Sequence, residues 1–173
     1  MQVRTSHPIV DAVLDRYRRE LGEAFPVYRN HVLRGLNYHE VLLGEPVPDT
    51  AALAWAVHDL GIWTAGTWDY LAPSADLVGK HAEEFGIEDT ERARRMVLDH
   101  HRLRGIDDRL PETFRIADRV DASHGLLRGP VPRADIETVV AELPYLGFHR
   151  FLLRTGTRWA LRHPFHPLPM VRW

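Results

Sequence analysis

Residues 51–61 read AALAWAVHDLG and place His58 beside Asp59 in a segment that is otherwise apolar. At helical spacing the apolar side chains of this stretch leave no polar face, which predicts a helix that passes through the middle of the molecule. We therefore expect His58 and Asp59 to be buried. A buried carboxylate is costly unless a cation or several hydrogen-bond donors meet it. Because neighbouring side chains on a helix point about 100° apart, the two residues can hold a single metal ion over the groove between them.

The composition limits the classes of protein to which the chain can belong. A length of 173 residues fits one domain. Cysteine is absent, which excludes disulfides, thiolate metal ligands and a cysteine nucleophile, and leaves His, Asp and Glu as the strong ligands. The N-terminal residues lack the apolar run of a signal peptide, and no stretch approaches the ~20 apolar residues of a membrane span, so we expect a soluble cytoplasmic protein. The formal net charge of −2 gives no general reason to expect binding to nucleic acid.

Capping signals and apolar periodicity predict an all-α, single-domain bundle of about seven or eight helices. Ser6 and Pro8 mark the start of the first helix, and Gly22 marks its end. The stretch of residues 61–74 is rich in Gly, Thr and aromatic residues and is expected to be a loop, either as the wall of a pocket or as an ordinary connection. The helices are expected at residues 6–21, 26–43, 51–61, 74–85, 90–102, 111–125, 134–143 and 147–162.

Further histidines fall on the apolar stripes of predicted helices. His31 lies within the stripe of the second helix, and His81 lies on the apolar face of the fourth. On the fifth helix His100 occupies the centre of the stripe, whereas His101 lies about 100° away and is expected to face outward. A histidine that faces the core is more often a hydrogen-bonded structural residue than a ligand. Arg34, about one turn beyond His31, favours the ligand interpretation because a buried guanidinium also needs an anion.

Two aspartates lie three residues apart on the sixth predicted helix. Asp118 and Asp121 share a face with apolar side chains, which is unusual for the same reason as at Asp59. Each can bind a metal ion or pair with an arginine such as Arg115 or Arg119. The arginine pair is a more realistic alternative for Asp121 alone than for both aspartates.

The C-terminal part of the chain is basic. From residue 143 onward it is formally +5 and contains no acidic residue, whereas the remainder is −7. Arginine recurs there at four-residue spacing, at Arg150, Arg154, Arg158 and Arg162. Such a row is most often a solvated or salt-bridged helix face. The alternative is that it binds an acidic partner or a membrane surface. The proline-rich tail HPFHPLPMVRW is expected to lie along the body or on a second subunit of a homo-oligomer.

Four candidate ligands, His31, His58, Asp59 and Asp118, lie on three predicted helices and face the core. Nitrogen and oxygen ligands from separate helices are what a divalent ion in a helical bundle requires. The sequence here resembles the HD-domain metal-dependent phosphohydrolase superfamily, whose signature is His, then His-Asp, then Asp. The matching segments are NHVLRG around His31, AWAVHDLG around His58 and Asp59, and FRIADRVDAS around Asp118. The resemblance covers about residues 25–125 and implies an HD-domain type of bundle, with the helices and tail of about residues 134–173 outside it.

The resemblance implies hydrolysis of a phosphate ester by attack of metal-bound water, with nucleotides among the candidate substrates. A divalent ion, which can be Mn, Fe, Co, Ni, Mg or Zn, lowers the pKa of bound water and polarises a phosphoryl oxygen. Asp59 is expected both to bind the metal and to orient the attacking water. Arg34 and Arg115 are expected to neutralise the phosphate, and Lys80 is a less secure candidate.

Some branches of the superfamily hold a second metal through two further histidines between the His-Asp pair and the last Asp. His81 and His100 fall in that interval and are candidates for a second metal or for contact with the substrate phosphate. Two other functions remain open. One is oxygen activation by a di-iron pair in the same scaffold, and the other is a non-catalytic, metal-stabilised module that binds a partner through its basic end.

Overall fold

The computed structural model describes residues 1–171, and these residues form a single all-helical domain with no β-strand, as predicted. Eight helices have nine residues or more, and α2 and α5 have four each. The elements are α1 (Pro8–Arg16), α2 (Arg18–Leu21), η1 (Gly22–Ala24), α3 (Phe25–Leu43), α4 (Asp49–Val57), α5 (Gly61–Thr64), α6 (Leu71–Ala82), η2 (Glu83–Phe85), α7 (Thr90–Asp99), α8 (Arg109–Ala122), α9 (Arg133–Glu142) and α10 (Phe148–Arg162).

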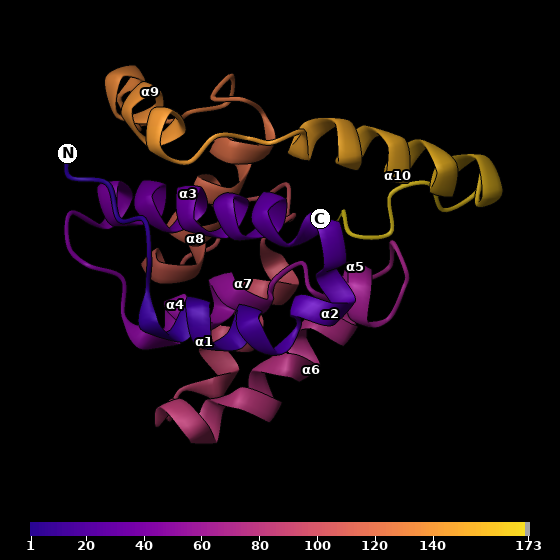
Figure 1. Ribbon diagram of the computed structural model, residues 1–173, viewed down its shortest axis with the longest axis horizontal. Helices are drawn as coiled ribbons and strands as arrows, with labels where there is room; N and C mark the ends of the chain where they lie inside the picture. The colour runs from indigo at the N-terminus through magenta and orange to yellow at the C-terminus, as the bar shows by residue number, and fades with distance from the viewer. Residues whose placement is uncertain (172–173) are drawn as a thin grey trace.

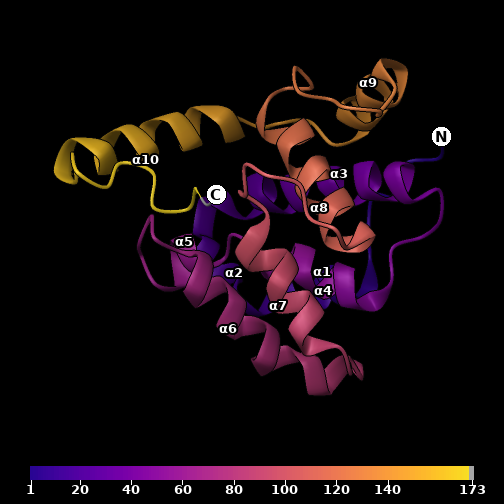
Figure 2. The ribbon, with the colours of Figure 1, turned by 180° about the vertical axis from the view of Figure 1, so that it is seen from behind.

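Helix α4 lies at the centre of the domain. Every side chain from Ala51 to Val57 is fully buried, which confirms the prediction drawn from its apolar composition. The helix packs against α1, α3, α6 and α7, while α3 packs along α8. Figures 1 and 2 show α1, α2, α4 and α6 on one side of α3, with α9 and α10 on the other. Because α4 lies at the centre, the residues that follow it, His58 and Asp59, lie in the middle of the bundle.

Two predicted helices are shorter than expected. Helix α4 ends at Val57, and residues 58–60 form a tight turn in which the Leu60 N–H donates to Val57 O and the Ile62 N–H donates to Asp59 O, both at 3.0 Å. The predicted helix at residues 6–21 is broken at Tyr17, where the backbone reaches φ −103° and ψ 15°, and its N-cap is His7 rather than Ser6. The predicted loop at residues 61–74 contains α5 and the start of α6.

The C-terminal helix reaches beyond the rest of the bundle. Figures 1 and 2 show that α10 lies on the α3 side and extends past the body, and that the chain after it folds back. Met170 is buried in a small cluster with Trp68 and Tyr70, so the tail lies along the body for the part that the structure describes. The last two residues of the predicted tail, 172 and 173, lie outside the described residues. Within residues 1–171, no helix has both the length and the apolarity that crossing a membrane requires.

Gly61 is required where the turn after α4 meets α6. A Cβ on Gly61 would lie 2.6 Å from Tyr70 O and 2.9 Å from the Ser74 Oγ, which accepts the Gly61 N–H at 2.9 Å. Because the nearer atom belongs to the backbone, it cannot rotate away. We expect Gly61→Ala to lower the free energy of unfolding by about 1–3 kcal/mol, as in other overpacked cores. Urea denaturation measures this change.

Gly79 provides the matched control for this substitution. It lies within α6, and a Cβ there meets no atom within 4 Å. Gly79→Ala should therefore raise the free energy of unfolding by about 0.4–1 kcal/mol, because alanine restricts the unfolded chain and is the better helix former. Equal effects of the two substitutions would contradict the steric argument.

His39 is a buried histidine held in its neutral form. Its Nδ1 accepts the Trp55 indole N–H at 3.1 Å, and its Nε2–H donates to the Thr113 Oγ1 at 3.0 Å. Burial lowers the pKa of His39 to about 3. The unfolded chain binds this proton at about pH 6.5, so His39 should make the protein less stable by about 1.4 kcal/mol for each pH unit between about 6.5 and 3. From pH 6.5 to 5 this amounts to about 2 kcal/mol.

The expected pH effect is measured by urea denaturation at pH 7 and pH 5 on the unaltered protein and on His39→Gln. Glutamine can accept from Trp55 and donate to Thr113 but does not titrate. The variant should therefore lose less stability on acidification. An identical loss in both proteins would show that His39 is not the titrating group.

Candidate metal centre

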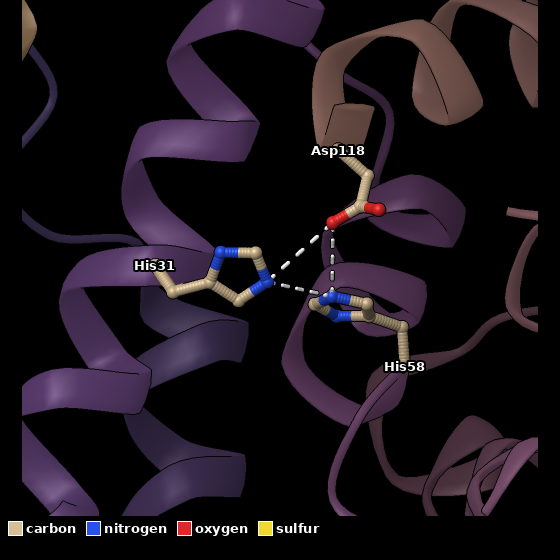
Figure 3. A group of neighbouring side chains, drawn as sticks. All are labelled: His31, His58 and Asp118. Atoms are coloured by element: carbon tan, nitrogen blue, oxygen red, sulfur yellow. Dashed lines mark hydrogen bonds and ion pairs between the residues drawn. The ribbon is translucent and has the colours of Figure 1, made fainter. Parts of the chain in front are cut away.

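Three elements converge on the centre of the domain. Helix α3 contributes His31, the turn after α4 contributes His58, and α8 contributes Asp118, and Figure 3 shows their side chains pointing toward one another. The two Nε2 atoms of His31 and His58 lie 3.0 Å apart, and the Asp118 Oδ1 lies 3.5 Å from the first and 3.7 Å from the second. All three side chains are buried. They form a group of ligand atoms that can hold a metal ion.

Asp59 lies beside these three residues, in the same turn as His58. Its Oδ2 lies 3.6 Å from the Nε2 of His31 and 3.4 Å from the Nε2 of His58. Its Oδ1 lies 3.4 Å from the Nε2 of His100, the residue that caps α7. His58, Asp59 and His100 thus form a second group of ligand atoms that shares His58 with the first. The four predicted ligands are therefore brought together, and His100 lies beside them.

The hydrogen bonds of the imidazoles leave three nitrogen lone pairs facing this centre. The Nδ1 of His58 contacts Trp55 O at 2.9 Å, and the Nδ1 of His100 contacts Val97 O at 2.7 Å. The Nδ1 of His31 contacts the Asp121 Oδ2 at 2.7 Å. Each partner is an oxygen that can only accept, so each Nδ1 carries the proton and each neutral ring presents an unprotonated Nε2. Two lone pairs at 3.0 Å repel unless a proton or a metal ion lies between them.

Two buried polar atoms of the centre lack hydrogen-bond partners among the described residues. They are the Asp59 Oδ1 and the His100 Nε2. Unpaired buried polar atoms are rare, and an unseen ion is one of their few explanations. For ligand atoms about 2.1 Å from a metal, neighbouring ligands lie about 3.0 Å apart in octahedral and about 3.4 Å apart in tetrahedral coordination. The measured separations of 3.0–3.7 Å are close to these values, so the residues fit a divalent ion.

The carboxylates of the centre are held in the ionised form that binds a metal. Burial alone would raise the pKa of Asp118, but the His58 imidazole, 3.7 Å away, and the other nearby imidazoles lower it to about 2. The pKa of Asp59 is lowered as well, because the neighbouring histidines outweigh its burial. Burial would lower the pKa of His31, but its hydrogen bond with Asp121 and the nearby Asp59 carboxylate raise it to about 9. In the absence of a metal, a proton on His31 therefore compensates part of the negative charge.

His101 faces the centre, contrary to the prediction that only His100 does so. Helix α7 ends at Asp99, so the two histidines lie beyond the regular helix and a helical wheel does not describe them. The Tyr70 hydroxyl and the Nε2 of His101 lie 2.7 Å apart. His100, His101 and Asp118 form a third group of ligand atoms. Because the three groups overlap, the cluster offers room for one ion or for two.

His81 and Lys80 lie apart from the centre. The Nε2 of His81 and the Tyr17 hydroxyl are 2.7 Å apart, and the Lys80 Nζ donates to the same hydroxyl at 3.2 Å. His81 belongs to none of the ligand groups found among the described residues. The structure therefore does not bring His81 into the centre, because its place on α6 directs it toward the end of α1. Tyr17, rather than a ligand, explains the burial of His81.

The two arginines predicted to contact phosphate are engaged elsewhere. Arg34 is fully buried and donates to both carboxylate oxygens of Asp121, at 2.6 and 2.8 Å, and to the carbonyls of residues 143 and 144. Arg115 donates to both oxygens of Glu112, at 2.8 and 2.6 Å, and to a carbonyl at 3.1 Å. Each guanidinium uses all three of its nitrogens. This arrangement disagrees with a role in phosphate binding, and it matches the alternative that Asp121 pairs with an arginine.

Aromatic side chains enclose the centre. The Phe148 ring at the start of α10 stacks on the His31 imidazole, with centroids 4.1 Å apart and an angle of 18°. One turn later, Phe151 stacks on Trp63 of α5 at 5.2 Å. Tyr28 holds the turn after α4, because its hydroxyl accepts the Asp59 N–H and donates to Ala56 O, both at 3.2 Å. The sequence contained no signal for these contacts, since they join segments far apart in the chain.

Comparisons of this chain with protein-family models, with curated proteins and with solved structures give no match.

Proposed function

We propose that this protein is a metal-dependent phosphohydrolase that acts on a small phosphate ester. The observation that carries the proposal is the convergence of the Nε2 atoms of His31 and His58, 3.0 Å apart and flanked by the ionised carboxylates of Asp59 and Asp118. Two carboxylates and neutral imidazoles balance the charge of one divalent ion. The resemblance of these four residues to the HD-domain signature supports the choice of phosphate chemistry.

A bound divalent ion would lower the pKa of water and polarise a phosphoryl oxygen. His31, His58 and Asp118 hold the ion through the three atoms that face one another. Asp59 places its Oδ2 3.4 Å from the Nε2 of His58, and no hydrogen bond among the described residues holds its Oδ1. That oxygen can accept a hydrogen bond from the attacking water and so orient it.

His100 takes over the contact with phosphate that the arginines do not provide. Burial lowers its pKa, but the Asp59 carboxylate, 3.4 Å away, and the charge of Asp118 raise the pKa above the ordinary value on balance. A protonated His100 can therefore donate its Nε2–H to a phosphoryl oxygen. Burial and the charge of His100 together lower the pKa of His101 to about 4, so this second ring stays neutral.

The test is a hydrolysis assay with nucleotides and sugar phosphates, in the presence of Mn, Co, Ni, Mg, Fe or Zn. Activity should require an added or retained metal and should be lost in His58→Ala and Asp59→Ala. Lys80→Ala is the control, because Lys80 is exposed and contacts Tyr17 rather than the centre. Hydrolysis at the unaltered rate in both site variants would remove the proposed active site.

A di-iron oxygenase is the second candidate, favoured by the overlap of the three ligand groups. His100 and His101 would offer nitrogen ligands to a second ion, because both belong to the group of ligand atoms formed with Asp118. Two irons per chain, with turnover that consumes dioxygen, would favour this candidate. One metal per chain and hydrolysis without oxygen would favour the phosphohydrolase.

A further inference from the structure

We propose that Asp121 is a positioning residue for the metal centre, with Arg34 as its counter-ion. This inference rests on the proposed metal site. Asp121 lies on the Nδ1 side of His31, away from the facing Nε2 atoms, so it does not take a ligand position. Its Oδ2 accepts the Nδ1–H of His31 at 2.7 Å, and both residues are buried. The bond determines which nitrogen carries the proton and which way the ring faces.

His31 is held differently from the other two imidazoles. His58 and His100 donate their Nδ1–H to backbone carbonyls, whereas His31 donates to an ionised carboxylate. A carboxylate partner makes the opposite nitrogen more basic than a carbonyl partner does, and so strengthens it as a metal ligand. Among these three imidazoles, His31 thus has the most basic Nε2 and should be the strongest metal ligand.

Arg34 keeps Asp121 in place and ionised. The guanidinium donates to both carboxylate oxygens, at 2.6 and 2.8 Å, which is the bidentate geometry of a strong ion pair. It also donates to Leu143 O and Pro144 O, just before α10 begins. The backbone carbonyl of Asp121 accepts from the His149 Nε2 at 2.8 Å. Asp121 is therefore held by Arg34 of α3 and by His149 of α10. The same helix α10 places Phe148 against His31.

The experiment is a titration with Co²⁺, followed by its visible absorption and by competition with a chelator. In Asp121→Asn, the amide oxygen can still accept from His31, but the charge is lost. The double variant Asp121→Asn with Arg34→Met removes both charges and avoids leaving the guanidinium buried without a partner. We expect Co²⁺ affinity to fall about 10- to 100-fold in both variants, with an altered spectrum. Circular dichroism reports whether each variant retains its helical fold.

A matched control is the pair of Arg115 and Glu112 on the same helix. This pair has the same bidentate geometry, and Arg115 is also buried although Glu112 is partly exposed, but neither residue forms a hydrogen bond with an imidazole of the centre. Glu112→Gln with Arg115→Met should leave Co²⁺ affinity and spectrum unchanged. If the folded Asp121 variants bind Co²⁺ with the affinity and spectrum of the unaltered protein, the positioning role is overturned. If the unaltered protein binds no Co²⁺, the proposed metal site itself is overturned.

Discussion

Replacement of His58 by alanine is expected to abolish stoichiometric metal binding. His58 belongs to two of the overlapping ligand groups, the one with His31 and Asp118 and the one with Asp59 and His100. Its removal leaves neither group complete. Loss of a residue that merely supports a ligand costs about 10- to 100-fold in affinity, so we expect loss of a direct ligand to cost more than about 100-fold. Elemental analysis of protein purified without added metal measures the content directly.

The same variant should lose the stabilisation that a metal confers. A ligand at about 100 times its Kd stabilises the folded state by about 2.7 kcal/mol. Chelation should therefore lower the melting temperature of the unaltered protein but leave that of His58→Ala unchanged. His166→Ala is the control, because His166 is exposed on the tail. Full metal content in folded His58→Ala would show that the centre does not bind metal as proposed.

Local signals predicted the approximate positions of the eight longer helices, but not α5 or the break at Tyr17. Proline in the first turn of α1 and α3 agrees with the observed starts of these helices. Gly44 and Gly86 adopt φ +73° and +62°, the left-handed conformation that ends a helix and favours glycine. Apolar composition predicted the burial of α4 in the same way, since a helix without a polar face must be covered on all sides.

The side chains near helix ends were harder to predict. Periodicity assumes that the helix continues, and it therefore placed His101 on the outside although α7 ends before it. The same assumption placed His58 and Asp59 on a regular helix, whereas they occupy the turn that follows α4. Residues just beyond a helix can turn inward, and this freedom is what brings His100 and His101 to one cluster.

Ion-pair partners could not be predicted from sequence spacing. Arg34 was expected to contact a phosphate because it lies one turn from His31, and its partner Asp121 is 87 residues away. Only the packing of α3 along α8 brings the two together. The pairing of Arg115 with Glu112, three residues apart, could have been predicted from helical spacing. The role of a buried charge thus depends on which element packs against it.

Trp55→Ala is expected to be among the most destabilising substitutions in the protein. The indole is fully buried at the centre of α4, stacks on the Phe114 ring with centroids 4.1 Å apart, and packs edge-on against His58 at 5.1 Å. It also lies directly over Gly35, where an added Cβ would come within 2.3 Å of the ring. Truncation leaves a large cavity, removes the donor to His39, and should cost about 3–5 kcal/mol. Because domains are stable by about 5–15 kcal/mol, this loss can unfold much of the population.

Urea denaturation in the presence of a chelator separates this effect from metal binding. Trp55→Phe should lose less stability than Trp55→Ala, since a ring still fills most of the space beside Phe114. Trp159→Ala is the matched control, because Trp159 is only partly buried on α10 and stacks on the exposed His163. A cost below about 1 kcal/mol for Trp55→Ala would mean that the site collapses around the missing ring. In that case α4 could not be the rigid support that holds His58 and Asp59 at the centre of the domain.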